Sequence, residues 1–179
     1  MTLFTTFKKQ GAANLQKTLG KSNPHQVPKI DKIIVAMGIG SLATRKGVKD
    51  FSDLEENLRK ITGQQPQMIL SKQSISNFKL RDGMPVMLKV TLRGEKAYDF
   101  IERFTQLVLP RVRDFSGLST RKFDGQGNYN IGFQSIGVFS EIMPEDIKTP
   151  MGVQICITTT TSEDAEALAL LKELGVIFH

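Results

Sequence analysis

A glycine-rich segment after an apolar stretch is the most enzyme-like feature of this sequence. Gly38-Ile39-Gly40-Ser41-Leu42-Ala43 matches the G-x-G-x-x-G/A pattern with which a strand-to-helix turn binds a dinucleotide. Such a site also needs an acid about 20 residues further on, at the end of the next strand, to hold a ribose. The acids near that distance fall inside a predicted helix (Asp53, Glu55 and Glu56). We therefore interpret the glycines as a structural turn whose backbone bends sharply or approaches a neighbour closely.

Few residues in the sequence could support other catalytic chemistry. His25 lies among helix breakers, His179 is the last residue, and the single cysteine, Cys156, lies inside a predicted strand, where cysteine usually acts as a small apolar residue. Neither a phosphate-binding G-x-x-x-x-G-K-[ST] loop nor metal-ligand spacing is present. We predict no catalytic residue, no metal and no cofactor. Two alternatives stay open: a nucleotide-dependent enzyme that uses the glycine turn, and a protein that acts only in protein–protein assembly.

The charges of the 179 residues are unevenly distributed. Residues 1–130 hold 22 Lys and Arg against 11 acids, whereas residues 131–179 hold two lysines against seven acids. The basic residues 1–130 favour a polyanionic partner, and the acidic residues 131–179 favour a different one. No run approaches the roughly 18–20 apolar residues that span a bilayer, so we expect no membrane association. The absence of acids before Asp31 could hint at an organelle transit peptide, but no arginine precedes Arg45, which weakens that interpretation.

The clearest strand carries the candidate binding residues. Apolar and other residues alternate strictly along Pro85–Arg93, so we expect Lys89, Thr91 and Arg93 to share one basic face that is exposed to solvent. The two cations lie ~13 Å apart at a rise of ~3.3 Å per residue, which is comparable to two phosphate spacings along a nucleic-acid strand. A polar loop, residues 71–84, precedes this strand. Because aromatic residues are few, recognition of folded RNA through its shape and backbone fits better than a stacking platform.

The remaining elements must position these residues. Helices are predicted over 3–19, over 48–61 with Gly63 as C-cap, over 95–109, and from Ser162 as N-cap with Leu168, Leu171 and Leu174 along one side. Strands are predicted over 32–37, 67–70, 131–139 and 153–161. The long connection 114–130 is expected to be functional or mobile. This order predicts the α+β class: a single two-layer domain, residues 1–179, whose mostly antiparallel sheet has helices packed on one face.

Several segments together resemble one family, the large-subunit ribosomal proteins named L-five, which bind 5S rRNA. The matching segments cover nearly the whole chain: residues 37–40, 62–66, 78–85, 89–95, 110–118, 123–129 and 157–160. The resemblance implies a non-catalytic protein of the cytoplasmic ribosome that helps attach 5S rRNA to the central protuberance. The implied partners are 5S rRNA, 23S rRNA, the P-site tRNA and neighbouring large-subunit proteins.

The resemblance also implies the rRNA-binding residues. They are Met37, Gly38, Gln64, Lys89, Thr91 and Arg93. The family usually has asparagine just before Met-Gly, whereas this chain has Ala36. That departure removes a hydrogen bond with a net contribution of about 0.5–1.5 kcal/mol.

Two further contacts follow from the same resemblance. The family's loop between the second and third strands reaches the P-site tRNA, and its residues here are Lys72, Ser74, Asn77, Phe78, Lys79 and Arg81. A region near the later hairpin faces a basic small-subunit protein across an intersubunit bridge. The candidates for that bridge are Glu141, Glu145 and Asp146.

Overall fold

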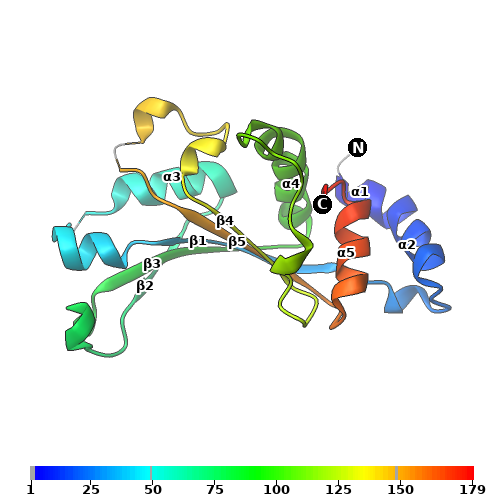
Figure 1. The fold of residues 1–179 in the computed structure, drawn as a ribbon, viewed down its shortest axis with the longest axis horizontal. Coiled ribbons are helices and arrows are strands. Elements are labelled where there is room, and N and C mark those ends of the chain that lie inside the picture. Colours follow the sequence, from blue (N-terminus) through cyan, green and yellow to red (C-terminus); the bar gives the residue numbers. More distant parts are fainter. Residues whose placement is uncertain (1–2, 49, 148) are drawn as a thin grey trace. The chain divides into compact units, whose positions relative to one another are not determined.

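Strands and helices are interleaved along the chain in the computed structural model, which describes residues 3–48, 50–147 and 149–179 (Figure 1). The strands are β1 (Ile30–Gly38), β2 (Gln67–Leu70), β3 (Pro85–Arg93), β4 (Tyr129–Phe133) and β5 (Val153–Thr159). The α-helices are α1 (Leu3–Thr6), α2 (Ala12–Leu19), α3 (Ser52–Thr62), α4 (Glu95–Arg103) and α5 (Asp164–Glu173). Three π-helical turns, Phe7–Gly11, Leu42–Lys46 and Phe104–Val108, and several 3-10 turns link them.

The five strands form one antiparallel sheet in the order β2-β3-β1-β5-β4. In the β2–β3 hairpin, Gln67 pairs with Lys89 and Met68 with Leu88, and the register shifts between Ile69 and Leu70. The predicted strand 67–70 and the predicted strand 85–93 are confirmed residue for residue. The predicted α+β class is confirmed.

Two of the strands, β3 and β5, bury one face more deeply than the other. Along β3, Leu88, Val90 and Leu92 are almost fully buried, while the residues between them are half-buried and Arg93 is exposed. β5 alternates in the same way, with Ile155 buried on the core side. Apolar burial on a single face is what a two-layer arrangement requires.

The chain divides into two compact units. The first comprises Met1–Ile33, Leu92–Ile131 and Cys156–His179, and the second comprises Ile34–Thr91 and Gly132–Ile155. Each is described separately below. That the whole chain forms a single domain stays a prediction.

In the second unit, α3 has well-defined ends. The backbone N–H of Ser52 donates to Asp50 at the start, and the Gly63 N–H donates to the Arg59 carbonyl at 2.7 Å, with Gly63 at a φ of +67°. Gly63 is therefore the predicted C-cap. The helix begins at Ser52 rather than near Val48, because the backbone of Phe51 lies outside the helical region, with φ of −120° and ψ of 13°.

In the first unit, the predicted helix 3–19 is present but contains a π-helical turn. Gly11 ends that turn, and a Cβ atom there would lie only 2.7 Å from the Phe7 ring. The glycine that weakens the helical pattern is therefore required by the packing of Phe7.

Two sequence predictions are wrong in detail. β4 ends at Phe133, not at residue 139, because Ser135 caps a 3-10 turn at Ile136–Val138 by accepting from the Gly137 N–H at 3.1 Å. α5 begins at Asp164, and Ser162 does not cap it. The Thr161 hydroxyl instead accepts a hydrogen bond from the Glu163 N–H at 3.2 Å.

The long connection 114–130 is held in place by residues far along the chain. The Asp164 carboxylate accepts hydrogen bonds from the N–H groups of Gly125 and Gly127, at 3.1 and 2.8 Å. Tyr129 donates its hydroxyl to the Ser119 carbonyl at 2.8 Å, and burial raises the pKa of Tyr129 to about 12. This part of the connection has the hydrogen bonding of an ordered segment rather than of a mobile one.

Among the described helices, none is both long enough and apolar enough to cross a membrane.

Candidate nucleic-acid interface

β3 presents its cations away from the core. Strand alternation places Lys89 and Thr91 opposite the buried Leu88 and Val90, and both are half-buried. Arg93 continues the same alternation and is exposed, although it belongs to the first unit. Lys89 and Thr91 of the second unit therefore lie on the face of β3 opposite its buried apolar side chains.

The neighbouring edge strand adds a polar side chain to this face. Gln67 is the cross-strand partner of Lys89 and is exposed. Directly opposite residues in an antiparallel pair project to the same face, with their Cβ atoms about 5 Å apart. Sequence reasoning missed Gln67, because β2 has only four residues, too few for alternation to reveal which of them face the solvent.

Gln64 is positioned by a turn and then bonded to β3. After the Gly63 cap, the Thr62 hydroxyl donates to the Gln64 carbonyl at 3.1 Å. The Gln64 side-chain Nε2 donates to the Thr91 carbonyl at 3.3 Å. The structure thus brings together two of the predicted residues, Gln64 and Thr91, which lie 27 positions apart in the sequence.

The predicted residues of the first strand are placed differently. Met37 is fully buried, so its side chain does not reach the surface, and only its backbone is left for an RNA contact. Gly38 is exposed at the end of β1. Ala36 projects to the opposite face from Met37 by strand alternation and is also buried, at 6% exposure.

The glycine turn needs neither a sharp bend nor a close approach. Gly38 and Gly40 are absent from the residues of positive φ. A Cβ atom at Gly40 would lie 3.5 Å from Val86, an ordinary contact, and one at Gly38 would meet nothing. Our expectation of a structurally demanding turn is therefore wrong. The turn is tied to β3 by a 2.9 Å hydrogen bond from the Ile39 N–H to the Val86 carbonyl.

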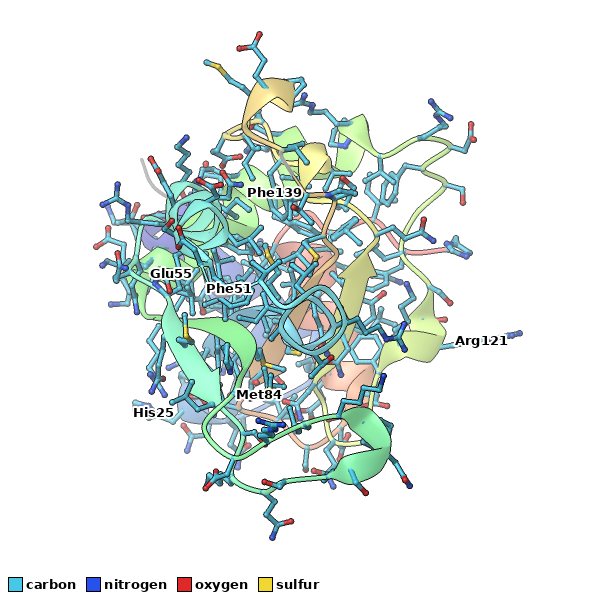
Figure 2. The ribbon with its side chains drawn as sticks, turned by 90° about the vertical axis from the view of Figure 1, so that its left-hand side faces the viewer. His25, Phe51, Glu55, Met84, Arg121 and Phe139 are labelled. Carbon is cyan, nitrogen blue, oxygen red and sulfur yellow. The ribbon has the colours of Figure 1, made fainter. Side chains whose placement is uncertain are left out.

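The loop between β2 and β3 is a narrow, hydrogen-bonded projection. At its base the Ser71 N–H donates to the Met84 carbonyl at 2.8 Å, and the Ser74 hydroxyl accepts from the Asp82 N–H at 2.9 Å. Nearer the tip, Ile75 and Leu80 exchange backbone hydrogen bonds of 2.9 and 3.1 Å. In Figure 2 this loop (green) lies at the bottom of the view, beyond Met84.

The predicted contact residues of this loop are all exposed. They are Lys72, Ser74, Asn77, Phe78, Lys79 and Arg81. Phe78 is 71% exposed, and Lys79 takes a left-handed conformation with φ of 53°. The tip lies across an open groove of about 670 Å³ from the turn at residues 40–45. Arg45 lines that groove, and sequence reasoning did not single it out, because only the tertiary fold brings residues 40–45 beside the loop.

The predicted bridge residues lie on another segment of the second unit. Glu145 is exposed in the 3-10 turn Pro144–Asp146, next to Met143, which is also exposed. Glu141 is half-buried and accepts a hydrogen bond from the Ser140 hydroxyl at 3.1 Å. The side chain of Asp146 lies outside the part of the molecule that the structure describes.

Within residues 3–48, 50–147 and 149–179, no three His, Cys, Asp or Glu side chains are grouped so that they could hold a metal ion.

Arg121, on the connection in the first unit, extends away from the body of that unit (Figure 2). These features define an α+β protein whose sheet has an uncovered face bearing cations and amides.

Comparison with known proteins identifies the family. A family model described as Ribosomal protein L5 matches residues 23–81, and the model of that family's C-terminus matches residues 85–178. Large ribosomal subunit protein uL5 of Natranaerobius thermophilus is 45% identical over 92% of this chain and 90% of its own length. The protein of the same name from Leifsonia xyli subsp. xyli is 45% identical over 97% of this chain and 88% of its own length. The one from Microcystis aeruginosa is 43% identical over 99% of this chain and 98% of its own length.

The chain therefore belongs to the ribosomal protein L5 family. It is a structural, non-enzymatic constituent of the large ribosomal subunit, and RNA binding and translation follow from that membership. The resemblance inferred from the sequence is confirmed.

Proposed function

We propose that the protein binds 5S rRNA through the uncovered face of β3 and its neighbours, and so helps attach that RNA to the central protuberance of the large subunit. The observation that carries the proposal is the alternation of β3. Leu88 and Val90 are buried, and Lys89 and Thr91, which alternate with them, are half-buried; Arg93, in the first unit, is exposed. Cations at this spacing suit a phosphate backbone, and the amides of Gln64 and Gln67 supply hydrogen bonds beside them.

The experiment is a filter-binding titration of 5S rRNA with the double variant Lys89→Glu, Arg93→Glu. Each lost phosphate contact removes about 0.7–0.9 from the slope of log affinity against log salt. We expect weaker binding and a flatter salt dependence. Lys172→Glu is the matched control, because Lys172 is an exposed cation of α5 in the acidic part of the chain. An unchanged slope in the double variant removes this face from the interface.

The projecting loop supports a second contact, with the P-site tRNA. Its tip is basic and its backbone is hydrogen-bonded, so the cations are held at a distance from the strands. A stiff projection loses less conformational entropy on binding than a flexible loop of the same length.

The exposed Glu145 near Met143 supports a third contact, with a basic small-subunit protein across the intersubunit bridge. Glu145 lies in the 3-10 turn Pro144–Asp146, and the half-buried Glu141 lies four residues before it. Charge reversal at Glu145 is expected to slow the association of the two subunits, with a larger effect at low salt.

A further inference from the structure

Gln64 is held at both ends by hydrogen bonds within the second unit. Its side-chain Nε2 donates to the Thr91 carbonyl at 3.3 Å, and its backbone N–H donates to the Thr62 hydroxyl at 3.4 Å. All three residues belong to the same unit. The bond to Thr91 directs the amide toward β3, and the bond to Thr62 holds the backbone that carries it.

Thr62 is a buried polar residue at the end of α3, with 5% of its surface exposed. Its hydroxyl oxygen lies 2.7 Å from the Leu58 carbonyl oxygen, one turn back, and 3.1 Å from the Gln64 carbonyl oxygen. A hydroxyl has one proton to donate and can also accept. The proton can go to either carbonyl, while the hydroxyl oxygen accepts from the Gln64 N–H. This one side chain therefore joins the last turn of the helix to the residue after its cap.

The way in which α3 ends explains why Gln64 needs this hydroxyl. Gly63 has a φ of +67° and donates its N–H to the Arg59 carbonyl at 2.7 Å, which is the single hydrogen bond of the αL type of helix end. That type of end provides no helical carbonyl for the N–H of the next residue, Gln64. Gln64 is half-buried, and a backbone N–H that is shielded from water needs a partner. The Thr62 hydroxyl is that partner.

The side chain of Gln64 continues an interrupted strand. The pairing of β2 with β3 begins at Gln67 and Lys89, so β2 starts two residues short of the position opposite Thr91. Pro66, just before β2, has no N–H with which to extend the pairing. The Gln64 amide donates to the Thr91 carbonyl instead. Whether the amide reaches that carbonyl depends on where the backbone of Gln64 is held.

We infer that Thr62 is a positioning residue for the RNA contact of Gln64. Its hydroxyl fixes the backbone of Gln64, so that the amide is oriented toward β3 before RNA arrives. The inference rests on the proposed function, in which Gln64 is part of the 5S rRNA interface. Thr62 is itself buried, so it acts through Gln64 and does not touch the RNA. A contact that is oriented in advance loses less conformational entropy on binding.

The first test measures 5S rRNA affinity by filter binding. Thr62→Val keeps the branched shape and removes the hydroxyl, and we expect it to bind roughly 2-fold to 10-fold more weakly than the parent. Thr62→Ser keeps the hydroxyl and should bind close to the parent. Parental affinity in Thr62→Val overturns the inference. Equal losses in the valine and serine variants also overturn it, because the hydroxyl is then not the group responsible.

Thr105→Val is the matched control for the loss of a helical threonine hydroxyl. The Thr105 hydroxyl donates to the Ile101 carbonyl at 3.0 Å, four residues back, as that of Thr62 does to Leu58. It lies in the other unit, away from Gln64. Thr105→Val should bind 5S rRNA as the parent does. A loss of affinity equal to that of Thr62→Val overturns the inference, because lower stability then accounts for both.

The second test combines Thr62→Val with Gln64→Ala. If Thr62 acts through Gln64, the double variant should bind no more weakly than Gln64→Ala alone, because the two losses are not independent. A purely structural role for Thr62 gives losses that multiply. A further loss in the double variant, by the factor that Thr62→Val causes in the parent, therefore overturns the inference.

The third test needs no RNA. Thr62→Val removes the acceptor of the Gln64 N–H, so native-state hydrogen exchange of that amide should become faster, whereas Thr62→Ser should keep its protection. Unchanged exchange in Thr62→Val overturns the inference.

The outcomes separate the two proposals. A parent protein that does not bind 5S rRNA overturns the proposed function. A parent protein that binds 5S rRNA, with unchanged affinity in Thr62→Val, overturns only the role of Thr62. Weaker binding in Thr62→Val, with recovery in Thr62→Ser and no further loss in the Gln64→Ala background, supports both.

Discussion

The side-chain amide of Gln64 donates a hydrogen bond of 3.3 Å to the backbone carbonyl of Thr91, joining the turn after α3 to the middle of β3. This bond uses one N–H of the amide and leaves the other N–H and the carbonyl oxygen for an RNA group. It also limits the rotamers of Gln64, so the side chain is oriented before RNA arrives. The pair lies beside Lys89 on the uncovered face.

Replacing Gln64 by alanine should therefore weaken binding of 5S rRNA. One hydrogen bond contributes about 0.5–1.5 kcal/mol, which corresponds to roughly a 2-fold to 12-fold loss of affinity. Gln65→Ala is the matched control, because the adjacent glutamine is exposed and makes no bond to β3 that the structure records. The filter-binding assay measures both, and equal affinities for the two variants would exclude an oriented role for Gln64.

Shortening the projecting loop should separate two functions. Replacing Ser74 to Asp82 by a short glycine linker removes the tip but keeps the base hydrogen bond from Ser71 to Met84. We expect 5S rRNA binding to be retained and tRNA retention on the ribosome to fall. Loss of 5S rRNA binding in this variant would show that the loop and the β3 face act as one site.

Gly127 should be the less replaceable of two glycines in the same connection. Both Gly125 and Gly127 have positive φ, so alanine costs about 1–2 kcal/mol at either position. A Cβ atom at Gly127 would also overlap the Thr161 carbonyl oxygen, whereas one at Gly125 meets nothing. Urea unfolding should show Gly127→Ala to be less stable than Gly125→Ala, by about 1–3 kcal/mol. Equal stabilities would mean that the connection shifts without cost.

The ion pair between Lys21 and Glu166 should make stability depend on pH. Lys21, at 2.5 Å, lowers the pKa of the Glu166 carboxylate, and the Thr161 hydroxyl lowers it further. A lowered pKa means that the folded protein binds fewer protons than the unfolded chain. The stabilisation is therefore present above the usual value of 4.5 and is lost as the pH falls through the folded value.

The variant Lys21→Met tests this linkage. It should be less stable than the parent at neutral pH, and the difference in unfolding free energy should shrink on acidification. Lys17→Met, one helical turn earlier on α2, is the control and should show no such dependence. A stability gap that stays constant down to acid pH would show that the pair contributes packing rather than charge.

Local patterns were sufficient for much of the fold. The alternation of β3 and the glycine after α3 gave correct elements and ends, because each depends on neighbours within a few residues. Two of the failures, at β4 and at the start of α5, occurred where a serine or threonine hydroxyl accepts a hydrogen bond from a backbone N–H.

The sequence by itself determined the basic strand, the exposed loop and the family, because these depend on residue identity and order. Only the tertiary structure decided which groups meet. Gln64 reaches Thr91 across 27 positions, and Arg45 comes to line the same groove as Phe78. The physical reason is that contacts between distant residues depend on how the elements pack, and periodicity along the chain carries no information about that packing.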